Sequence, residues 1–273
     1  MKKKKRIVYN LCLAVLICIF LGSAGYLAYY FLQSKKSEDQ FQELEAMIDA
    51  PVNEEEIVYV ATDGDAEPGL EFVNIDGTRV QKSFASLYRE NHDFIGWLSI
   101  EDTNIDYPVM QTKKDSEYYL HRNFEKKSDV NGLPFLDAKC GIDELKGNLM
   151  VYGHHMKSGL MFAHLEDFEK ADFYKKHKTI EFDTLYEKRQ YEVVAVFRSK
   201  VYKENEDVFK YYRYVGKLSK KQYETYVKNC KKLSIYKDGA TPAYGEQLLT
   251  LVTCAYHTEN GRFVVVARKK ENV

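Results

Sequence analysis

The segment QLLTLVTC, residues 247–254, is strongly apolar and ends in a cysteine. A second apolar run, residues 262–268, follows it across Asn260-Gly261, a dipeptide typical of tight hairpin turns. The two runs predict neighbouring antiparallel strands, with Cys254 at the end of one and Arg262 at the start of the other. A thiol at the end of a rigid strand is held in one place and can still face solvent, so Cys254 is a candidate nucleophile.

The chain upstream of this pair combines short strand signals with two helical ones. Further strands are predicted at residues 97–100, 105–109, 149–152, 179–182 and 190–197. Helices are predicted over 83–90 and over 219–233, and the second opens with the capping box Ser219-x-x-Gln222. Its apolar face is expected to comprise Tyr223, Tyr226, Val227, Cys230 and Leu233. The pattern is mixed but mainly β, and it favours a closed or nearly closed barrel with peripheral helices, one of them inserted before the cysteine strand.

The N-terminus carries a membrane signal. Residues 2–6 read KKKKR, and a predominantly apolar run of 26 residues follows, from 7 to 32. A spanning helix needs roughly 20 residues and a signal-peptide core only about 7–15, so the run predicts an uncleaved anchor. The positive-inside bias places residues 1–6 in the cytoplasm and the rest of the chain outside. A cleaved signal peptide with a long core is the alternative, supported by Ser23-Ala24-Gly25.

A connecting region follows the anchor. Ser37-x-x-Gln40 resembles another capping box and predicts a juxtamembrane helix that ends by Pro51. Residues 53–69 are acidic and rich in turn formers, which indicates a linker. The expected organisation is a basic tail over 1–6, the anchor over 7–32, the juxtamembrane helix and linker over 33–69, and one globular domain over 70–273.

Composition excludes several classes of protein. The hydrophobic content of 45% excludes global disorder, and 40 basic against 41 acidic residues give no reason to expect a nucleic-acid partner. Of the five cysteines, Cys140, Cys230 and Cys254 lie outside the anchor, and none has a CxxC spacing. Neither a disulfide framework nor a zinc finger is therefore indicated, although a Cys140–Cys230 pair stays open.

Two further residues make Cys254 a candidate catalytic cysteine. Acyl transfer by a thiol needs a group that manages protons and a group that stabilises an oxyanion. His154 follows a glycine at a predicted strand end, which aims its imidazole outward, and Arg262 lies across the hairpin from the thiol. Arg268 is a rival arginine at the far end of its strand.

A metal site is the main chemical alternative. His154, His155, His257 and Cys254 could surround zinc, but their spacing matches no usual ligand pattern. We therefore expect neither a metal nor a cofactor.

These motifs resemble those of a known family. Thr250-Leu251-Val252-Thr253-Cys254 matches the TLxTC signature of sortases, the cysteine transpeptidases of Gram-positive cell envelopes. Tyr152-Gly153-His154 is similar to the segment that carries their catalytic histidine, and Arg262 stands where their catalytic arginine is expected. The inserted helix and the N-terminal helical region are similar to class B. The resemblance covers residues 70–270 and implies a closed barrel of about eight strands.

The resemblance also implies a mechanism. Cys254 would attack the carbonyl of a Thr–X bond in the C-terminal sorting signal of a surface protein, forming a thioester. His154 would act as general acid and base, and Arg262 would hold the carbonyl and the developing negative charge. An amino group of a peptidoglycan precursor, or a pilin lysine, would then resolve the thioester.

The same resemblance suggests where substrate lies. Asn104, Tyr152 and Thr253 are expected to line the groove, with residues 208–214 as one wall. Tyr211, Tyr212 and Tyr214 in that wall are equally suited to packing.

Two other functions remain open from the sequence. A hydrolytic cysteine peptidase would use the same residues without an amine acceptor, and an inactive module would only bind envelope peptides.

Overall fold

The computed structural model describes residues 2–52, 57–61, 68–142 and 146–270. The chain forms two compact units, Met1–Gln40 and Phe41–Val273, which are treated separately below.

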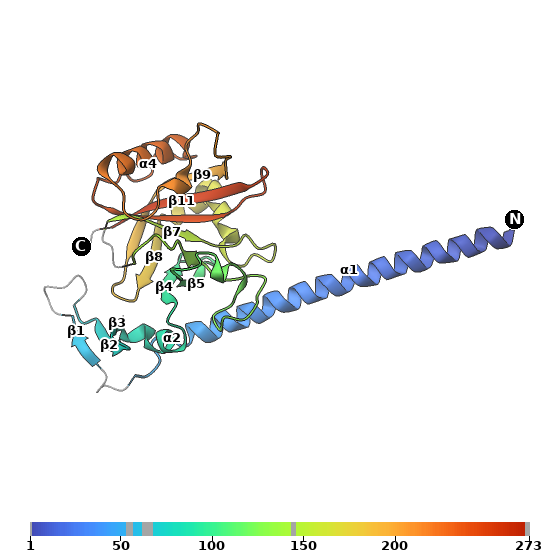
Figure 1. Ribbon diagram of the computed structural model, residues 1–273, viewed down its shortest axis with the longest axis horizontal. Helices are drawn as coiled ribbons and strands as arrows, with labels where there is room; N and C mark the ends of the chain where they lie inside the picture. The colour runs from blue at the N-terminus through green and yellow to red at the C-terminus, as the bar shows by residue number, and fades with distance from the viewer. Residues whose placement is uncertain (1, 53–56, 62–67, 143–145, 271–273) are drawn as a thin grey trace. The chain divides into compact units, whose positions relative to one another are not determined.

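The second unit is built on a closed barrel. Its strands are β4 (Phe94–Ser99), β5 (Asp106–Met110), β6 (Phe135–Leu136), β7 (Gly147–Tyr152), β8 (Thr179–Thr184), β9 (Gln190–Lys200), β10 (Gln247–Cys254) and β11 (Gly261–Lys269). They follow the order β10-β11-β9-β8-β4-β5-β6-β7, and the parallel pairing of β7 with β10 closes the ring (Figure 1). The predicted eight-stranded barrel is confirmed.

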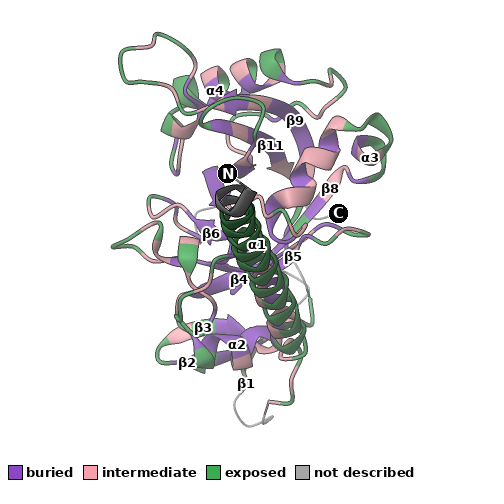
Figure 2. Ribbon diagram, turned by 90° about the vertical axis from the view of Figure 1, so that its right-hand side faces the viewer, coloured by how far each residue is buried: buried purple, intermediate pink, exposed green. Residues whose placement is uncertain are grey.

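Both faces of β10 are buried, which explains its nearly continuous apolar sequence. Leu249 and Leu251 belong to the cluster that fills the barrel, while Leu248 and Val252 belong to a second cluster beneath helix α4 (Lys220–Leu233). The barrel strands are largely buried (Figure 2). Helix α4 lies over the β9–β11 side of the barrel (Figure 1).

Helix α4 begins as predicted. The Ser219 hydroxyl accepts from the Gln222 N–H and the Gln222 side chain accepts from the Ser219 N–H, which confirms the capping box. The expected apolar face is buried except for Leu233, the last residue of the helix, which is 46% exposed. Cys140 and Cys230 are buried free thiols in different clusters, so they do not form a disulfide.

A small antiparallel sheet precedes the barrel. It contains β1 (Ile57–Val60), β2 (Glu71–Ile75) and β3 (Thr78–Gln81), followed by a 3-10 turn and helix α2 (Ala85–Glu90). The expectation of a linker is wrong for β1, because Ile57-Val58-Tyr59-Val60 is a β-branched and aromatic run that pairs with β2. The remaining helical segments are η2 (Lys82–Phe84), η3 (Tyr118–His121), η4 (Phe162–Glu169), α3 (Ala171–Lys176) and η5 (Tyr211–Arg213).

Helix α1 (Lys2–Glu45) runs without a break through Ser37, so the helix start predicted there is wrong. Inside a helix a serine hydroxyl can donate to the carbonyl one turn back, as that of Ser37 does to Gln33 at 3.2 Å. The last residues of α1 belong to the second unit, where the Phe41 ring meets Tyr107 edge-on at 5.0 Å. The packed part of the chain thus begins at Phe41, upstream of Leu70.

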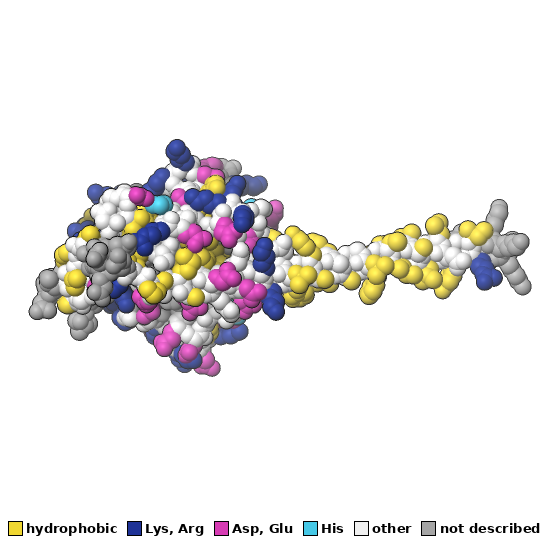
Figure 3. Space-filling view, turned by 90° about the horizontal axis from the view of Figure 1, so that it is seen from below, with side chains coloured by type: hydrophobic (Ala, Val, Ile, Leu, Met, Phe, Trp, Pro, Cys, Tyr) yellow, Lys and Arg dark blue, Asp and Glu magenta, His cyan; other side chains and the backbone are white. Residues whose placement is uncertain are grey.

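The first unit is one apolar helix. Residues Tyr9–Glu45 are long and apolar enough to cross a membrane by length and composition, a test that a signal sequence near the N-terminus also passes. Its large apolar side chains are exposed, with Phe20 and Tyr26 each at 71% (Figures 2 and 3). On the face of the second unit seen in Figure 3, acidic and basic side chains are interspersed.

Candidate active site

A cavity of about 360 Å³ opens where β7 and β10 end and β11 begins. His154, Cys254 and Arg262 all line it, and so do Tyr152 and Thr253. The structure therefore brings the three candidate catalytic residues to one pocket.

The barrel register explains this convergence. β7 and β10 run parallel with Tyr152 opposite Val252, so their carboxyl ends lie side by side. His154 and Cys254 each follow that pair by two residues. Arg262 is directly opposite Cys254 in the antiparallel β10–β11 pair. Two strand pairings therefore place all three side chains at one edge of the barrel.

The two strand ends are also bound to each other. The Gly153 N–H donates to the Val252 carbonyl at 3.1 Å, and the Thr253 hydroxyl donates to the Gly153 carbonyl at 2.8 Å. A Cβ on Gly153 would lie 2.6 Å from the Phe162 ring, so only glycine fits there. Thr253 forms part of the cavity wall, but its hydroxyl is engaged in holding the backbone.

His154 is held in a defined orientation. Its Nε2 lies 2.7 Å from the Leu120 carbonyl oxygen. A carbonyl oxygen only accepts hydrogen bonds, so Nε2 carries a proton that it donates, and the second proton is exchanged at Nδ1. The ring stacks on His121 with centroids 5.3 Å apart. Burial lowers the pKa of His154 and the neighbouring His121 acts in the same direction, against the opposing effect of the Leu120 hydrogen bond.

The two arginines of β11 have different surroundings. Arg262 donates from Nη1 to the Gly261 carbonyl at 2.9 Å, and none of the described residues forms an ion pair with it. Arg268 is bound to Glu192 at 2.9 Å and to Glu246 at 3.2 Å. Arg262, and not its rival, therefore has a guanidinium available at the cavity.

The tyrosine wall combines the two roles that the sequence left open. Tyr211 and Tyr212 line the cavity. The Tyr214 ring instead packs on the rings of Phe209 and Tyr226, with centroid distances of 5.4 and 5.5 Å. Tyr211 is also buried, and burial raises its pKa well above the ordinary value while Arg262 opposes that shift.

Asn104 is not at the cavity. Its side-chain nitrogen lies 3.2 Å from Nε2 of His164, whose Nδ1 is 2.7 Å from Asp167. Asn104 therefore ties the β4–β5 turn to η4, and it is not among the residues that line this cavity.

Sequence reasoning missed the wall opposite the catalytic strands. The cavity is lined here by Leu120 of η3, by Glu117 just before η3 and by Asp137 just after β6. The Asp137 carboxylate accepts a hydrogen bond from the Tyr152 hydroxyl at 3.3 Å. Burial is the main cause that raises the pKa of Tyr152, and the Asp137 carboxylate raises it further. No local sequence signal marks these residues, because their partners lie 15 to 34 positions away.

Among the described residues, no group of three or more His, Cys, Asp or Glu side chains is arranged to hold a metal ion. His154, His155 and Cys254 instead make hydrogen bonds or line the cavity individually.

Comparison with known proteins decides the family. Residues 98–270 match the family model of the sortase domain. The chain belongs to the sortase family. This sortase is 33% identical over 191 residues to sortase B of Staphylococcus aureus, covering 69% of this chain and 75% of that one.

Solved structures agree. The fold is similar to that of sortase B from Bacillus anthracis with a TM-score of 0.68 and 27% identity, covering 88% of this chain and 99% of the other. A Staphylococcus aureus sortase B–substrate complex matches with a TM-score of 0.62 and 31% identity, covering 71% and 87%. The sequence resemblance is thereby confirmed, and the protein is a class B-like cysteine transpeptidase.

Proposed function

We propose that this sortase cleaves a C-terminal sorting signal after threonine, forms a thioester on Cys254 and transfers the acyl group to an amine. The observation that carries the proposal is the meeting of Cys254, His154 and Arg262 at one cavity. Substrates would be surface proteins with a sorting signal, and the acceptor would be an amino group of a peptidoglycan precursor or a pilin lysine.

In the first half-reaction His154 takes the proton of the Cys254 thiol, and the resulting thiolate attacks the threonine carbonyl carbon. A C–S bond forms and the carbonyl π electrons move to oxygen. Arg262 stabilises this oxyanion with a permanent charge and a planar array of donors. The Ala255 N–H next to the thiol already donates to the Gly261 carbonyl at 3.0 Å, which leaves the guanidinium as the main donor.

Collapse of the intermediate breaks the C–N bond. The departing amine takes a proton from His154. This proton comes from Nδ1, because the Nε2–H is already donated to the Leu120 carbonyl. In the second half-reaction an amine attacks the thioester and neutral His154 takes its proton. The C–S bond breaks to release the Cys254 thiolate, and His154 returns that proton to the sulfur. The lowered pKa of His154 favours this neutral form.

We further propose that residues 7–32 anchor the enzyme, with residues 1–6 cytoplasmic and the packed catalytic unit, from Phe41 onward, outside. The apolar stretch of helix α1 and the basic residues at its N-terminal end support this orientation. Protease added to intact cells should remove the catalytic domain and leave a membrane-bound N-terminal fragment. Full protection of the domain would contradict the orientation.

Intact mass spectrometry of the full-length protein in detergent micelles tests the chemistry. With a panel of sorting-signal peptides we expect an adduct equal to the N-terminal peptide fragment, and its replacement by ligated product when an amine is added. Cys254→Ala should form no adduct. Release of hydrolysed peptide alone, with acceptor present, would indicate a peptidase, and binding without any adduct would indicate an inactive module.

A further inference from the structure

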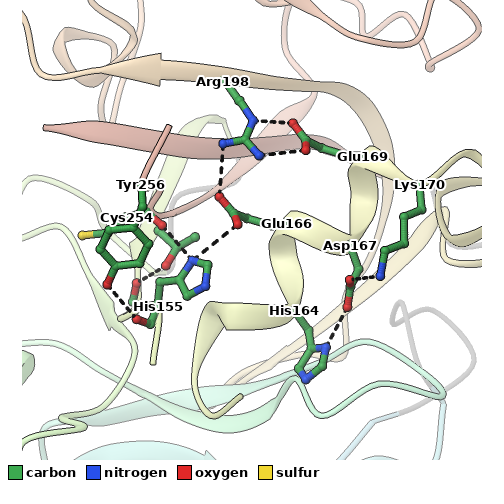
Figure 4. Close-up of polar contacts among 11 residues, drawn as sticks. His155, His164, Glu166, Asp167, Glu169, Lys170, Arg198, Cys254 and Tyr256 are labelled. Atoms are coloured by element: carbon green, nitrogen blue, oxygen red, sulfur yellow. Dashed lines mark hydrogen bonds and ion pairs between the residues drawn. The ribbon is translucent and has the colours of Figure 1, made fainter. Parts of the chain in front are cut away.

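A second histidine contacts the backbone of the proposed nucleophile. His155 follows His154, and its Nδ1 lies 3.0 Å from the Cys254 carbonyl oxygen. Because that oxygen can only accept, Nδ1–H is the donor. The sulfur of Cys254 points away from His155, so the imidazole acts on the peptide group and not on the thiol (Figure 4).

The contact replaces strand pairing at a position where pairing ends. β7 accompanies β10 only as far as the Tyr152–Val252 pair, two residues before Cys254. A carbonyl at such an edge needs another donor, and the His155 side chain supplies it.

A second hydrogen bond joins the same two segments, with its donor on the segment after Cys254 and its acceptor on His155. The Tyr256 hydroxyl donates to the His155 carbonyl at 3.2 Å, and its ring meets the imidazole edge-on with centroids 5.2 Å apart. The segment that carries His154 and the segment that carries Cys254 are therefore bound to each other beyond their strands.

Charged residues of η4 and β9 lie beside the His155 imidazole. Glu166 of η4 lies 3.8 Å from Nδ1 of His155 and 3.4 Å from Nη1 of Arg198 on β9. Glu169 holds Arg198 through Nε and Nη2 (Figure 4). The His155 side chain is only 17% exposed, so packing restricts its rotation.

We propose that His155 is a positioning residue: by donating from Nδ1 to the Cys254 carbonyl it fixes the peptide plane of Cys254 and thereby the direction of the sulfur at the cavity that His154 also lines. The inference rests on the proposed role of Cys254 as nucleophile. Reacting groups are sensitive to placement, and a shift of 1 Å can lower a rate by roughly 100-fold.

Three substitutions separate the donor from the bulk of the side chain. His155→Asn keeps an N–H donor near the Nδ1 position, His155→Gln moves the donor outward toward the Nε2 position, and His155→Leu removes it at similar volume. His164→Leu is the matched control, since His164 lies in the same β7–β8 connection and contacts Asn104 and Asp167 instead.

The readout is the rate of thioester formation in the full-length protein, followed by quenching and intact mass over a range of peptide concentrations. We expect His155→Leu and His155→Gln to lower the maximal acylation rate by about 10- to 100-fold with little change in the half-saturating peptide concentration. His155→Asn should stay within about threefold of wild type by the same reasoning, and His164→Leu should not change the rate.

Wild-type acylation by a folded His155→Gln or His155→Leu would overturn the inference. So would an Asn variant as slow as the Gln variant at equal melting temperature, because a purely structural role would not distinguish the two donors. The Gln variant keeps this comparison available if the Leu variant does not fold. Cys254→Ala is measured beside these variants to separate the two proposals. An adduct that still forms on Cys254→Ala would refute the assignment of Cys254 as nucleophile, on which the role of His155 rests.

Discussion

The two ends of the β10–β11 hairpin share the same strands but differ in how their polar groups are satisfied. At one end, Gln247 accepts from Tyr191 and from the fully buried Arg189, and Arg268 is held by two glutamates. At the other end, Cys254 and Arg262 face a cavity and no described carboxylate pairs with the arginine. The polar groups that are bound to one another at the first end stabilise the barrel. The Arg262 guanidinium at the cavity is available to interact with substrate.

The strongest test of this contrast removes the thiol. Cys254→Ala should abolish thioester formation and turnover, because no other group supplies the nucleophile, and should leave the melting temperature nearly unchanged since the side chain is only partly buried. Intact mass and thermal unfolding measure both. A variant that unfolds would place Cys254 in the core instead of the site.

Arg262→Lys keeps the charge but loses the planar donors. Removing one oxyanion donor typically lowers kcat by about 100- to 1000-fold, and we expect a loss of that size in kcat/KM. Steady-state transpeptidation with a fluorescent peptide measures it. Arg268→Lys is the matched control on the same strand, and near-wild-type activity of the Arg262 variant would exclude Arg262 from the chemistry.

Arg189→Met should show the opposite profile. Its guanidinium is buried and binds Glu187, Gln247 and the Ile142 carbonyl, so its loss leaves buried acceptors unpaired. We expect the free energy of unfolding to fall by about 3 kcal/mol, with activity of the remaining folded protein retained. Urea unfolding followed by fluorescence provides the value, and a change below the error of that measurement would contradict the contrast.

The pH dependence of acyl transfer should report the environment of His154. Its pKa lies below the ordinary value of about 6.5, so the neutral base persists as the pH falls and is lost only below that lowered pKa. Aminolysis of the preformed thioester, at constant free-amine concentration, should therefore have an acidic limb below pH 6.5. His121→Asn removes a charge effect that lowers this pKa and should move the limb to higher pH. A wild-type limb above pH 6.5 would contradict the assignment.

The smallest effect is expected at the stabilising end of β11. The Arg268 side chain is partly exposed, so its ion pairs are screened and Arg268→Lys should cost no more than about 1 kcal/mol of stability. Activity should be unchanged. Thermal unfolding and the transpeptidation assay check this, and a large loss of rate would show that the two ends are coupled.

The catalytic side of the pocket could be predicted because it lies on strands. Long apolar runs mark β10 and β11, whose antiparallel pairing sets Arg262 opposite Cys254, although the connection between them spans residues 255–260 and is longer than the tight turn expected at Asn260-Gly261. The glycine before it and the predicted strand end mark His154 locally, whereas its approach to Cys254 depends on the parallel β7–β10 pairing.

The opposite side could not be predicted from local pattern. Leu120 of η3 and Asp137 after β6 reach the pocket through contacts with residues 34 and 15 positions away. Asn104, whose amide is bound to His164, is not among the residues that line it. The sequence marks His155 only as a possible metal ligand and as the residue after His154. Its importance emerges only from the carbonyl that it faces.

The parallel closure of the barrel also sets when the enzyme can become reactive. The Cys254 thiol is 100 positions downstream of His154, and its strand must insert between β7 and β11 to complete the ring. A chain made from its N-terminus therefore presents the imidazole long before the thiol, and such long-range pairing forms late and slowly. Synthesis order thus acts as a built-in delay, because a chain that ends before β10 holds His154 but lacks the thiol.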